Sequence, residues 1–118
     1  MREILFRGKR IDNGEWIEGS LWLYGEDAHI FGGPDFPYGC LWHKVDPSTA
    51  GQYTGLTDKN GKRIFEGDIV CLRTGRCHEV KYGDGCFYMD GTAITAKYLD
   101  RFTVIGNIHD NPELLENP

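Results

Sequence analysis

The stretch QYTGLTDKNGKRIFEGDIV, residues 52–70, decides how this chain folds. Its DKNG segment at 58–61 contains Asn-Gly, a strong hairpin signal because both central residues of such a turn need a positive φ angle. The flanking segments YTGLT and KRIF are therefore predicted strands. The EGD segment at 66–68 predicts a tight corner before the strand IVCLR, with the Asp68 carboxylate binding backbone N–H groups two residues further on. The charges of this stretch are thus predicted to shape the backbone rather than to react.

Turn signals of the same kind divide the rest of the chain into short apolar runs. Glycine supplies 16 of the 118 residues, about twice the average share of roughly 7%, which indicates tight turns and short strands. Asn-Gly at 13–14 predicts a hairpin between ILFRGKRI and EWIEGSLWLY, and Gly-Asp-Gly at 83–85 predicts one between CHEVKY and CFYMD. AHIF and FTVIGNI are further predicted strands, whereas ITAKYL fits a strand or one helical turn. DNPELLENP predicts a short helix that begins near Pro112.

This succession of short strands predicts an all-β or β-rich fold: a small barrel or sandwich of antiparallel strands with a short C-terminal helix. The length suits a single domain, residues 1–118, or two β sub-lobes of about 1–50 and 51–118. EGDIVCLR and HEVKYGDGCFYM resemble strand pairs of SH3-like barrels, so we expect an SH3-like C-terminal portion. Such a fold does not by itself determine a function.

Aromatic residues are the main candidates for an interaction surface. In the second predicted strand, Trp16, Trp22 and Tyr24 lie on one face, opposite an apolar face that runs from Ile17 to Leu23. A row of this kind is expected to pack against another part of the chain or against a partner. The segment GGPDFPYGC is rich in Gly and Pro and is predicted to be irregular through about Ser48. Long loops with aromatic side chains pack onto the core or serve recognition. Three aromatic residues belong to this stretch: Phe36, Tyr38 and Trp42.

The charge of the chain argues against a general affinity for nucleic acid. The formal net charge is −5 and the isoelectric point about 5.3, whereas domains that bind phosphates usually carry a basic excess. One local exception is residues 59–81, with six basic and three acidic residues. These charges either discourage edge-to-edge pairing of hairpins or contact a nucleic-acid backbone. The basic residues of that alternative site are Arg73, Arg76 and Lys81, and the bases would stack on Tyr82, Phe87 or Tyr88.

Cysteine and histidine do not form a recognisable metal site. Structural zinc sites usually contain C-x₂₋₄-C pairs, whereas Cys71 and Cys77 are six residues apart. A site built from Cys77, His78 and Cys86 is therefore disfavoured. Cys71, in an apolar strand, is better interpreted as a small buried hydrophobe. No cofactor or metal is predicted.

Nucleophilic catalysis is not predicted either. Cys40 lies three residues before His43, but in cysteine hydrolases the base generally comes from elsewhere in the fold. Ser20 and Ser48 do not occur in a nucleophile-elbow sequence. The glycines lack the spacing of a phosphate-binding loop. We therefore expect a protein without catalytic residues; a metal-dependent enzyme is the less favoured alternative.

The N-terminal sequence MREILFRGKRID lacks the apolar core of a signal peptide. No segment approaches the ~20 apolar residues needed to cross a bilayer. The sequence therefore predicts a cytoplasmic protein without membrane contact. In that compartment its four cysteines are expected to be reduced thiols.

Three segments carry a resemblance: MREILFRGKR at the start, QYTGLTDKNGKRIFEGDIV in the middle and VIGNIHDNPELL near the end. In this order they resemble the YopX family, small proteins of bacteriophages and prophage-bearing bacteria. GGPDFPYGC and the residues from Arg73 to Tyr98 carry no family signature. The resemblance implies a phage or prophage origin, a β-rich fold and self-association. It implies no activity and no catalytic residues.

Two functions follow as expectations. The first is a phage accessory protein that is a non-enzymatic interaction module, forming a homo-oligomer and binding a host or phage protein in the bacterial cytoplasm. Aromatic residues are the usual anchors of such interfaces. The alternative is a small β-barrel that binds nucleic acid through its basic residues.

Overall fold

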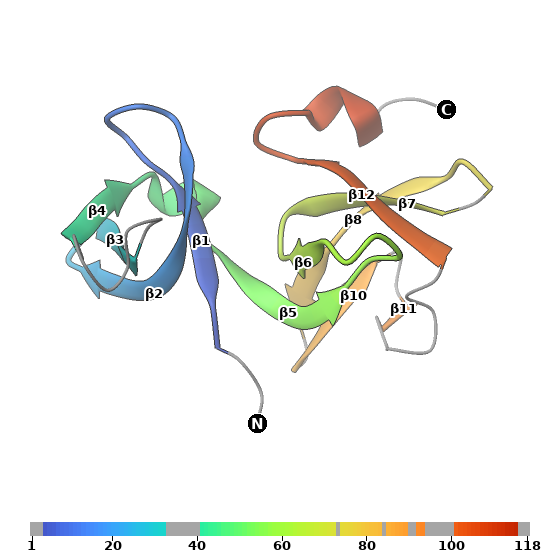
Figure 1. Cartoon of the computed structure of the whole chain (residues 1–118), viewed down its shortest axis with the longest axis horizontal. Helices are drawn as coiled ribbons and strands as arrows, with labels where there is room; N and C mark the ends of the chain where they lie inside the picture. Colours follow the sequence, from blue (N-terminus) through green and yellow to red (C-terminus); the bar gives the residue numbers. More distant parts are fainter. Residues whose placement is uncertain are drawn as a thin grey trace. The chain divides into compact units, whose positions relative to one another are not determined.

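The computed structural model describes residues 4–32, 41–72, 74–83, 85–89, 92–93 and 101–115. The chain divides into two compact units, residues 1–53 and 54–118 (Figure 1). Antiparallel strands dominate both units, which confirms the predicted β-rich fold. Within the described ranges, no helix is long and apolar enough to cross a membrane.

The first unit is built on one antiparallel sheet. Its strands pair in the order β4-β3-β2-β1, and β1 also pairs with the start of β5. The turn between β1 and β2 is the predicted Asn-Gly turn, in which Gly14 has a φ of 74°. The elements are β1 (Phe6–Lys9), β2 (Trp16–Tyr24), β3 (Asp27–Gly32), β4 (Leu41–Val45), the 3-10 turn η1 (Pro47–Thr49) and β5 (Gly51–Thr57).

The core of the first unit lies on one face of this sheet. Its buried residues are Ile17, Ala28, Ile30 and Val45, and Phe6 and Leu21 pack against them. The backbones of β2 and β3 approach closely beside this core, because Gly19 pairs with Gly32. A Cβ atom on Gly19 would collide with the carbonyl oxygen of Phe31. On the predicted apolar face Ile17 is buried and Leu21 half-buried, whereas Leu23 near the end of the strand is 64% exposed.

The second unit contains two three-stranded sheets, ordered β12-β7-β8 and β11-β10-β9, and the hairpin that joins β5 to β6. Its core consists of Ile64, Val70, Val80, Met89, Phe102 and Val104, with Leu72 packed against it. The elements are β6 (Arg63–Phe65), β7 (Asp68–Leu72), β8 (Cys77–Glu79), β9 (Lys81–Gly83), β10 (Cys86–Met89), β11 (Thr92–Ala93), β12 (Phe102–Asn107) and the 3-10 turn η3 (Pro112–Leu115).

Of the two predicted arrangements, a small barrel or a sandwich, the closed barrel is not formed: over the described residues the sheets end in edge strands and do not close. A barrel requires its first and last strands to pair. Here the segment CHEVKY, predicted as one strand, is interrupted at Val80, which separates β8 from β9. The Val80 side chain is fully buried, and its N–H donates to the carbonyl of Asp68 at 2.8 Å. The chain therefore passes from one sheet into the other at this residue.

One other prediction needs correction: the segment predicted to be irregular through Ser48 contains β4, which is held by pairing with β3. The predicted short C-terminal helix is present as a single 3-10 turn, in which Leu114 is half-buried and Leu115 is 37% exposed. The segment ITAKYL, residues 94–99, lies outside the described residues.

Candidate interaction surface

The outer face of β2, β3 and β4 carries five ring side chains, here called the aromatic face. The strand register brings them together, because Trp22 pairs directly with His29 and Phe31 pairs directly with Trp42. Side chains alternate between the two faces of a sheet, so residues at this spacing lie on the same face. The members of the aromatic face are Trp22, Tyr24, His29, Phe31 and Trp42.

Trp22 lies at the centre of the aromatic face. Its ring centroid is 5.2 Å from that of Trp42, 5.4 Å from that of His29 and 5.6 Å from that of Tyr24. Phe31 and Trp42 are 4.8 Å apart. The four centroid distances lie within the range that aromatic pairs favour. The ring planes are tilted against one another by 39° to 49°. Each ring therefore packs against its neighbours.

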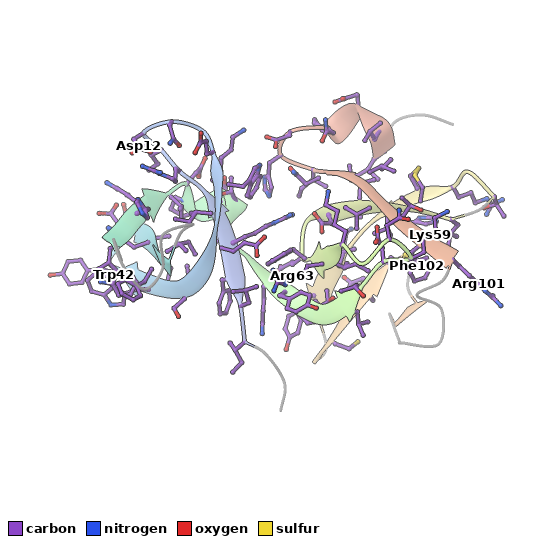
Figure 2. All side chains as sticks on the ribbon, viewed as in Figure 1. Asp12, Trp42, Lys59, Arg63, Arg101 and Phe102 are labelled. Carbon is purple, nitrogen blue, oxygen red and sulfur yellow. A yellow bond between two sulfur atoms is a disulfide. The ribbon has the colours of Figure 1, made fainter. Side chains whose placement is uncertain are left out.

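Much of this aromatic surface is exposed. Trp22 is 44% exposed, Trp42 47% and Tyr24 69%, and Figure 2 shows Trp42 among the side chains that project from this sheet. Together the three side chains leave roughly 350 Å² of mostly apolar surface in contact with solvent. Contiguous patches of a few hundred Å² mark interaction sites more often than scattered hydrophobic residues do.

Charged residues lie beside the rings. Lys44 Nζ is 3.5 Å from Asp27 Oδ1, and both side chains are about half exposed. Lys44 also pairs with His29 across the sheet. The Nδ1 atom of His29 is buried and has no hydrogen-bond partner among the described residues. Because the Lys44 charge is offset by Asp27, the aromatic face has no net basic character.

The structure brings only some of the residues named from the sequence together on this face. Trp22 and Tyr24 are together as expected, and Trp42 joins them from β4. Trp16 is half-buried at the other end of β2, where the Arg7 guanidinium lies 4.8 Å from its ring centroid. Phe36 and Tyr38 lie outside the described residues.

His29 and Phe31 are the members that sequence reasoning missed. In AHIF these two residues alternate with Ala28 and Ile30, which places them on the opposite face of the strand. This alternation indicates a shared surface only when the pairing of β3 with β2 and β4 is known.

In the central stretch, residues 52–70, the carboxylates of Asp58 and Asp68 bind backbone N–H groups. Asp58 is buried, and its Oδ1 accepts hydrogen bonds from the backbone N–H groups of Asn60 and Lys62 at 2.8 and 2.9 Å. Its Oδ2 accepts a third, at 2.9 Å, from the N–H of Val104 in β12. Burial acts to raise the pKa of Asp58, but these backbone hydrogen bonds outweigh it and hold the pKa below its ordinary value. Both carboxylate oxygens thus serve to join the β5–β6 turn to β12.

Asp68 also binds the backbone. Its Oδ2 accepts from the N–H of Phe65 at 2.7 Å, three residues earlier in the chain. Gly67, with a φ of 90°, completes the corner, and its carbonyl accepts from the N–H of Ile108. In the described ranges, no group of three or more His, Cys, Asp or Glu side chains is arranged to hold a metal ion.

The cysteines differ from the sequence expectation of four reduced thiols. Cys71 and Cys77 form a disulfide between β7 and β8. They pair directly across the hairpin, with Cα atoms 4.1 Å apart, a register that the spacing of six residues did not reveal. Cys71 is therefore not an isolated buried hydrophobe, and Cys77 is removed from the disfavoured metal set. Cys86 is a free, exposed thiol. Cys40, the predicted neighbour of His43, lies outside the described residues.

The alternative basic site is spread over different elements. Arg76 lies in the β7–β8 turn and Lys81 on β9, and both are exposed, while Arg73 lies outside the described residues. Beside Lys81, Tyr82 is 53% exposed and its ring meets Phe87 edge-on at 4.9 Å. Phe87 itself is buried, so it is not available for base stacking.

Lys59, another basic residue of the 59–81 stretch, lies beside the start of β12. The N–H of Lys59 donates to the carbonyl of Phe102 at 3.2 Å, which places Lys59 at the end of β12 that carries Arg101 (Figure 2).

Comparison with known proteins identifies the chain. A family model described as YopX protein matches residues 5–116. The chain belongs to the YopX family. A search of the curated proteins finds no match. Among solved structures, protein EF1440 from Enterococcus faecalis is similar, with 28% sequence identity and a TM-score of 0.64. The match covers 98% of this chain and 99% of that chain.

The central and the C-terminal of the three segments that carried the YopX resemblance contact each other in this structure. The central stretch supplies β5, β6 and β7, and the stretch from residue 104 supplies most of β12 and η3. They are joined by the bonds from Val104 to Asp58 and from Ile108 to Gly67. These bonds give the two segments a structural role in the second unit.

Proposed function

We propose that this YopX protein is a non-enzymatic interaction module of a phage or prophage that self-associates and binds a host or phage protein through its aromatic face. Its place of action is the cytoplasm of the bacterial host. One observation carries the proposal: Trp22, Tyr24 and Trp42 form a contiguous, mutually supported surface that is substantially exposed.

The composition of the aromatic face suits an interface. Trp and Tyr are enriched among the residues that dominate binding energy, because they bury a large apolar area. Association normally costs free energy when side chains are ordered. The ring contacts around Trp22 lower that cost, since these side chains already restrain one another in the free protein.

The size of the face sets the expected strength of self-association. Stable complexes bury about 800 Å² on each partner. The roughly 350 Å² that Trp22, Tyr24 and Trp42 expose is about half of that. We therefore expect a weak, concentration-dependent dimer rather than an obligate one. A different protein partner would reach higher affinity by covering polar surface around the rings as well.

Sedimentation equilibrium and light scattering over a range of protein concentrations test self-association. The average mass of the wild-type protein should rise with concentration, and Trp22→Ala and Trp42→Ala should each suppress the rise. Tyr82→Ala is the matched control, because it removes an exposed aromatic side chain from the second unit. Circular dichroism confirms that each variant is folded. A strict monomer at every concentration would refute self-association.

The heterologous partner requires a separate experiment. A pull-down from phage-infected host cells, with and without nuclease, should recover a protein that is retained after nuclease treatment. Its recovery should be lost with the Trp22→Ala and Trp42→Ala baits and kept with Tyr82→Ala. Equal recovery by all baits would exclude the aromatic face as the docking surface.

Nucleic-acid binding is the second candidate, and the exposed Tyr82 beside Lys81 is the observation that favours it. It predicts an affinity that falls steeply with salt and weakens when Arg73, Arg76 and Lys81 are neutralised. Absence of DNA and RNA retention at about 50 mM salt, where phosphate contacts are strongest, would eliminate it.

A further inference from the structure

Cys71 and Cys77 face each other across a hairpin that backbone bonds already hold. They are a directly paired position of β7 and β8. Just beyond them, the N–H of Leu72 donates to the carbonyl of Arg76 at 2.8 Å, and the N–H of Gly75 donates to that of Leu72 at 2.9 Å. The strand register, and not the covalent bond alone, therefore keeps the two sulfur atoms adjacent.

The pair lies outside the buried core. Val70, the residue before Cys71, is 1% exposed and belongs to the core cluster. Because side chains alternate along a strand, Cys71 is directed to the opposite face, and both cysteines are only partly buried. A small reagent can thus reach the disulfide without opening the core.

The reduced form is also accommodated. Cys77 Sγ lies 3.6 Å from the carbonyl oxygen of Gly75, which is an acceptor for the thiol hydrogen when the disulfide is open. The bond closes a ring of residues 71–77 only, so it constrains a segment that the hairpin already constrains. Both oxidation states are therefore compatible with the same fold.

We propose that Cys71 and Cys77 are a reversible oxidation site whose substrates are low-molecular-weight thiols and their disulfides. In reduction, the thiolate of a small thiol attacks one sulfur, which breaks the Cys71–Cys77 bond and forms a mixed disulfide with that cysteine. A second small thiol then attacks the mixed disulfide and releases a small-molecule disulfide. Two electrons and two protons pass from the two small thiols to the protein, which now carries two thiols. Oxidation by a small disulfide is the reverse sequence.

The structural consequence is local. β8 is an edge strand of the β12-β7-β8 sheet and contacts η3. The disulfide fastens this edge strand to β7, so its reduction loosens β8 while the β12–β7 pairing persists. A disulfide in a cytoplasmic protein is most often transient or redox-sensing, which agrees with this role.

Redox titration of the folded protein tests the site. The titration uses the Cys86→Ser variant, which lacks the exposed free thiol that would otherwise react with glutathione. The protein is equilibrated in mixtures of reduced and oxidised glutathione, then acid-quenched, alkylated and weighed by mass spectrometry. We expect the disulfide and dithiol forms to interconvert completely without denaturant, with an unchanged far-ultraviolet circular dichroism spectrum. Hydrogen exchange of the β8 amides should accelerate about tenfold on reduction, while exchange in β12 stays the same.

The double variant Cys71→Ser and Cys77→Ser, in the same background, is the control. It should reproduce the exchange pattern of the dithiol form and ignore the redox buffer. Reduction that occurs only in denaturant, reduction that unfolds the second unit, or failure of the double variant to fold would each show a permanent structural bond. Any of these results overturns the proposal.

Discussion

Replacing Asp58 with alanine removes the common acceptor of three backbone N–H groups. Two of these, from Asn60 and Lys62, belong to the turn, and the third comes from Val104 in β12. Asn60 and Lys62 are exposed, so water can replace the carboxylate there. Val104 is 8% exposed, and its N–H would be left without an acceptor in a buried setting. The variant therefore tests whether Asp58 has the structural role that its contacts indicate.

The magnitude follows from these environments. A buried donor left unsatisfied costs about 1–3 kcal/mol, and each of the two turn bonds contributes about 1 kcal/mol. We expect Asp58→Ala to lower the free energy of unfolding by about 3–5 kcal/mol. Asp58→Asn keeps one carbonyl oxygen for the turn but directs its NH₂ group at the N–H of Val104. Its expected loss is about 1–3 kcal/mol.

The same carboxylate predicts a dependence on pH. Because the pKa of Asp58 is lower in the folded protein than its ordinary value, the ionised group stabilises the fold. This contribution is complete above the unfolded pKa of about 3.9 and is lost as the pH falls through the folded pKa. Asp58→Asn should therefore be less sensitive to acid than the wild type below about pH 4.

Urea unfolding, followed by fluorescence and circular dichroism, measures both effects. Asp12→Ala is the control: it removes an exposed carboxylate that is hydrogen-bonded to Arg10, and it should change stability by less than about 0.5 kcal/mol. If Asp58→Ala were no more destabilising than this control, the carboxylate would not hold β12, and its burial would need another explanation.

The remaining predictions concern the backbone and the disulfide. Gly61 has a φ of 81° and open space around its Cβ position, so Gly61→Val should cost about 1–3 kcal/mol by backbone strain alone, and thermal melting should show a smaller loss for Gly61→Asn. Gly19→Ala should destabilise the first unit by about 3 kcal/mol, because the new methyl group meets the carbonyl of Phe31; a wild-type melting profile would contradict the close strand approach. Opening the Cys71–Cys77 bond should cost at most about 2.5 kcal/mol for so short a ring, measured by urea unfolding of the oxidised and reduced forms, and a larger loss would mean that the bond holds more than the hairpin.

Local signals in the sequence were sufficient for the turns. Asn-Gly at 13–14 and 60–61 predicted both hairpins, because the ability to adopt a positive φ angle depends on the residue type alone. The strand pairing was not accessible in this way. The break at Val80 and the existence of β4 depend on which strands become neighbours, and no short segment encodes that.

The candidate site shows the same limit. Trp22 and Tyr24 lie two residues apart on one strand, so their common face was predictable from alternation. Trp42 and Phe31 join them only through the β3–β4 register. The Cys71–Cys77 disulfide likewise depends on the β7–β8 register. The capping role of Asp58 in its own turn was foreseeable, whereas its bond to Val104, 46 residues later, was not.

That long connection has a consequence for synthesis on the ribosome. Translation adds about 5–20 residues per second, so Asp58 leaves the exit tunnel seconds before Val104 does. By residue 53 the first unit has β1 to β4 and the start of β5, so it can become compact during this interval. The second unit must wait for β12, and meanwhile Ile64 and Val70 stay uncovered. The two units thus fold one after the other during synthesis. Until β12 is made, the second unit exposes apolar residues and needs protection from aggregation.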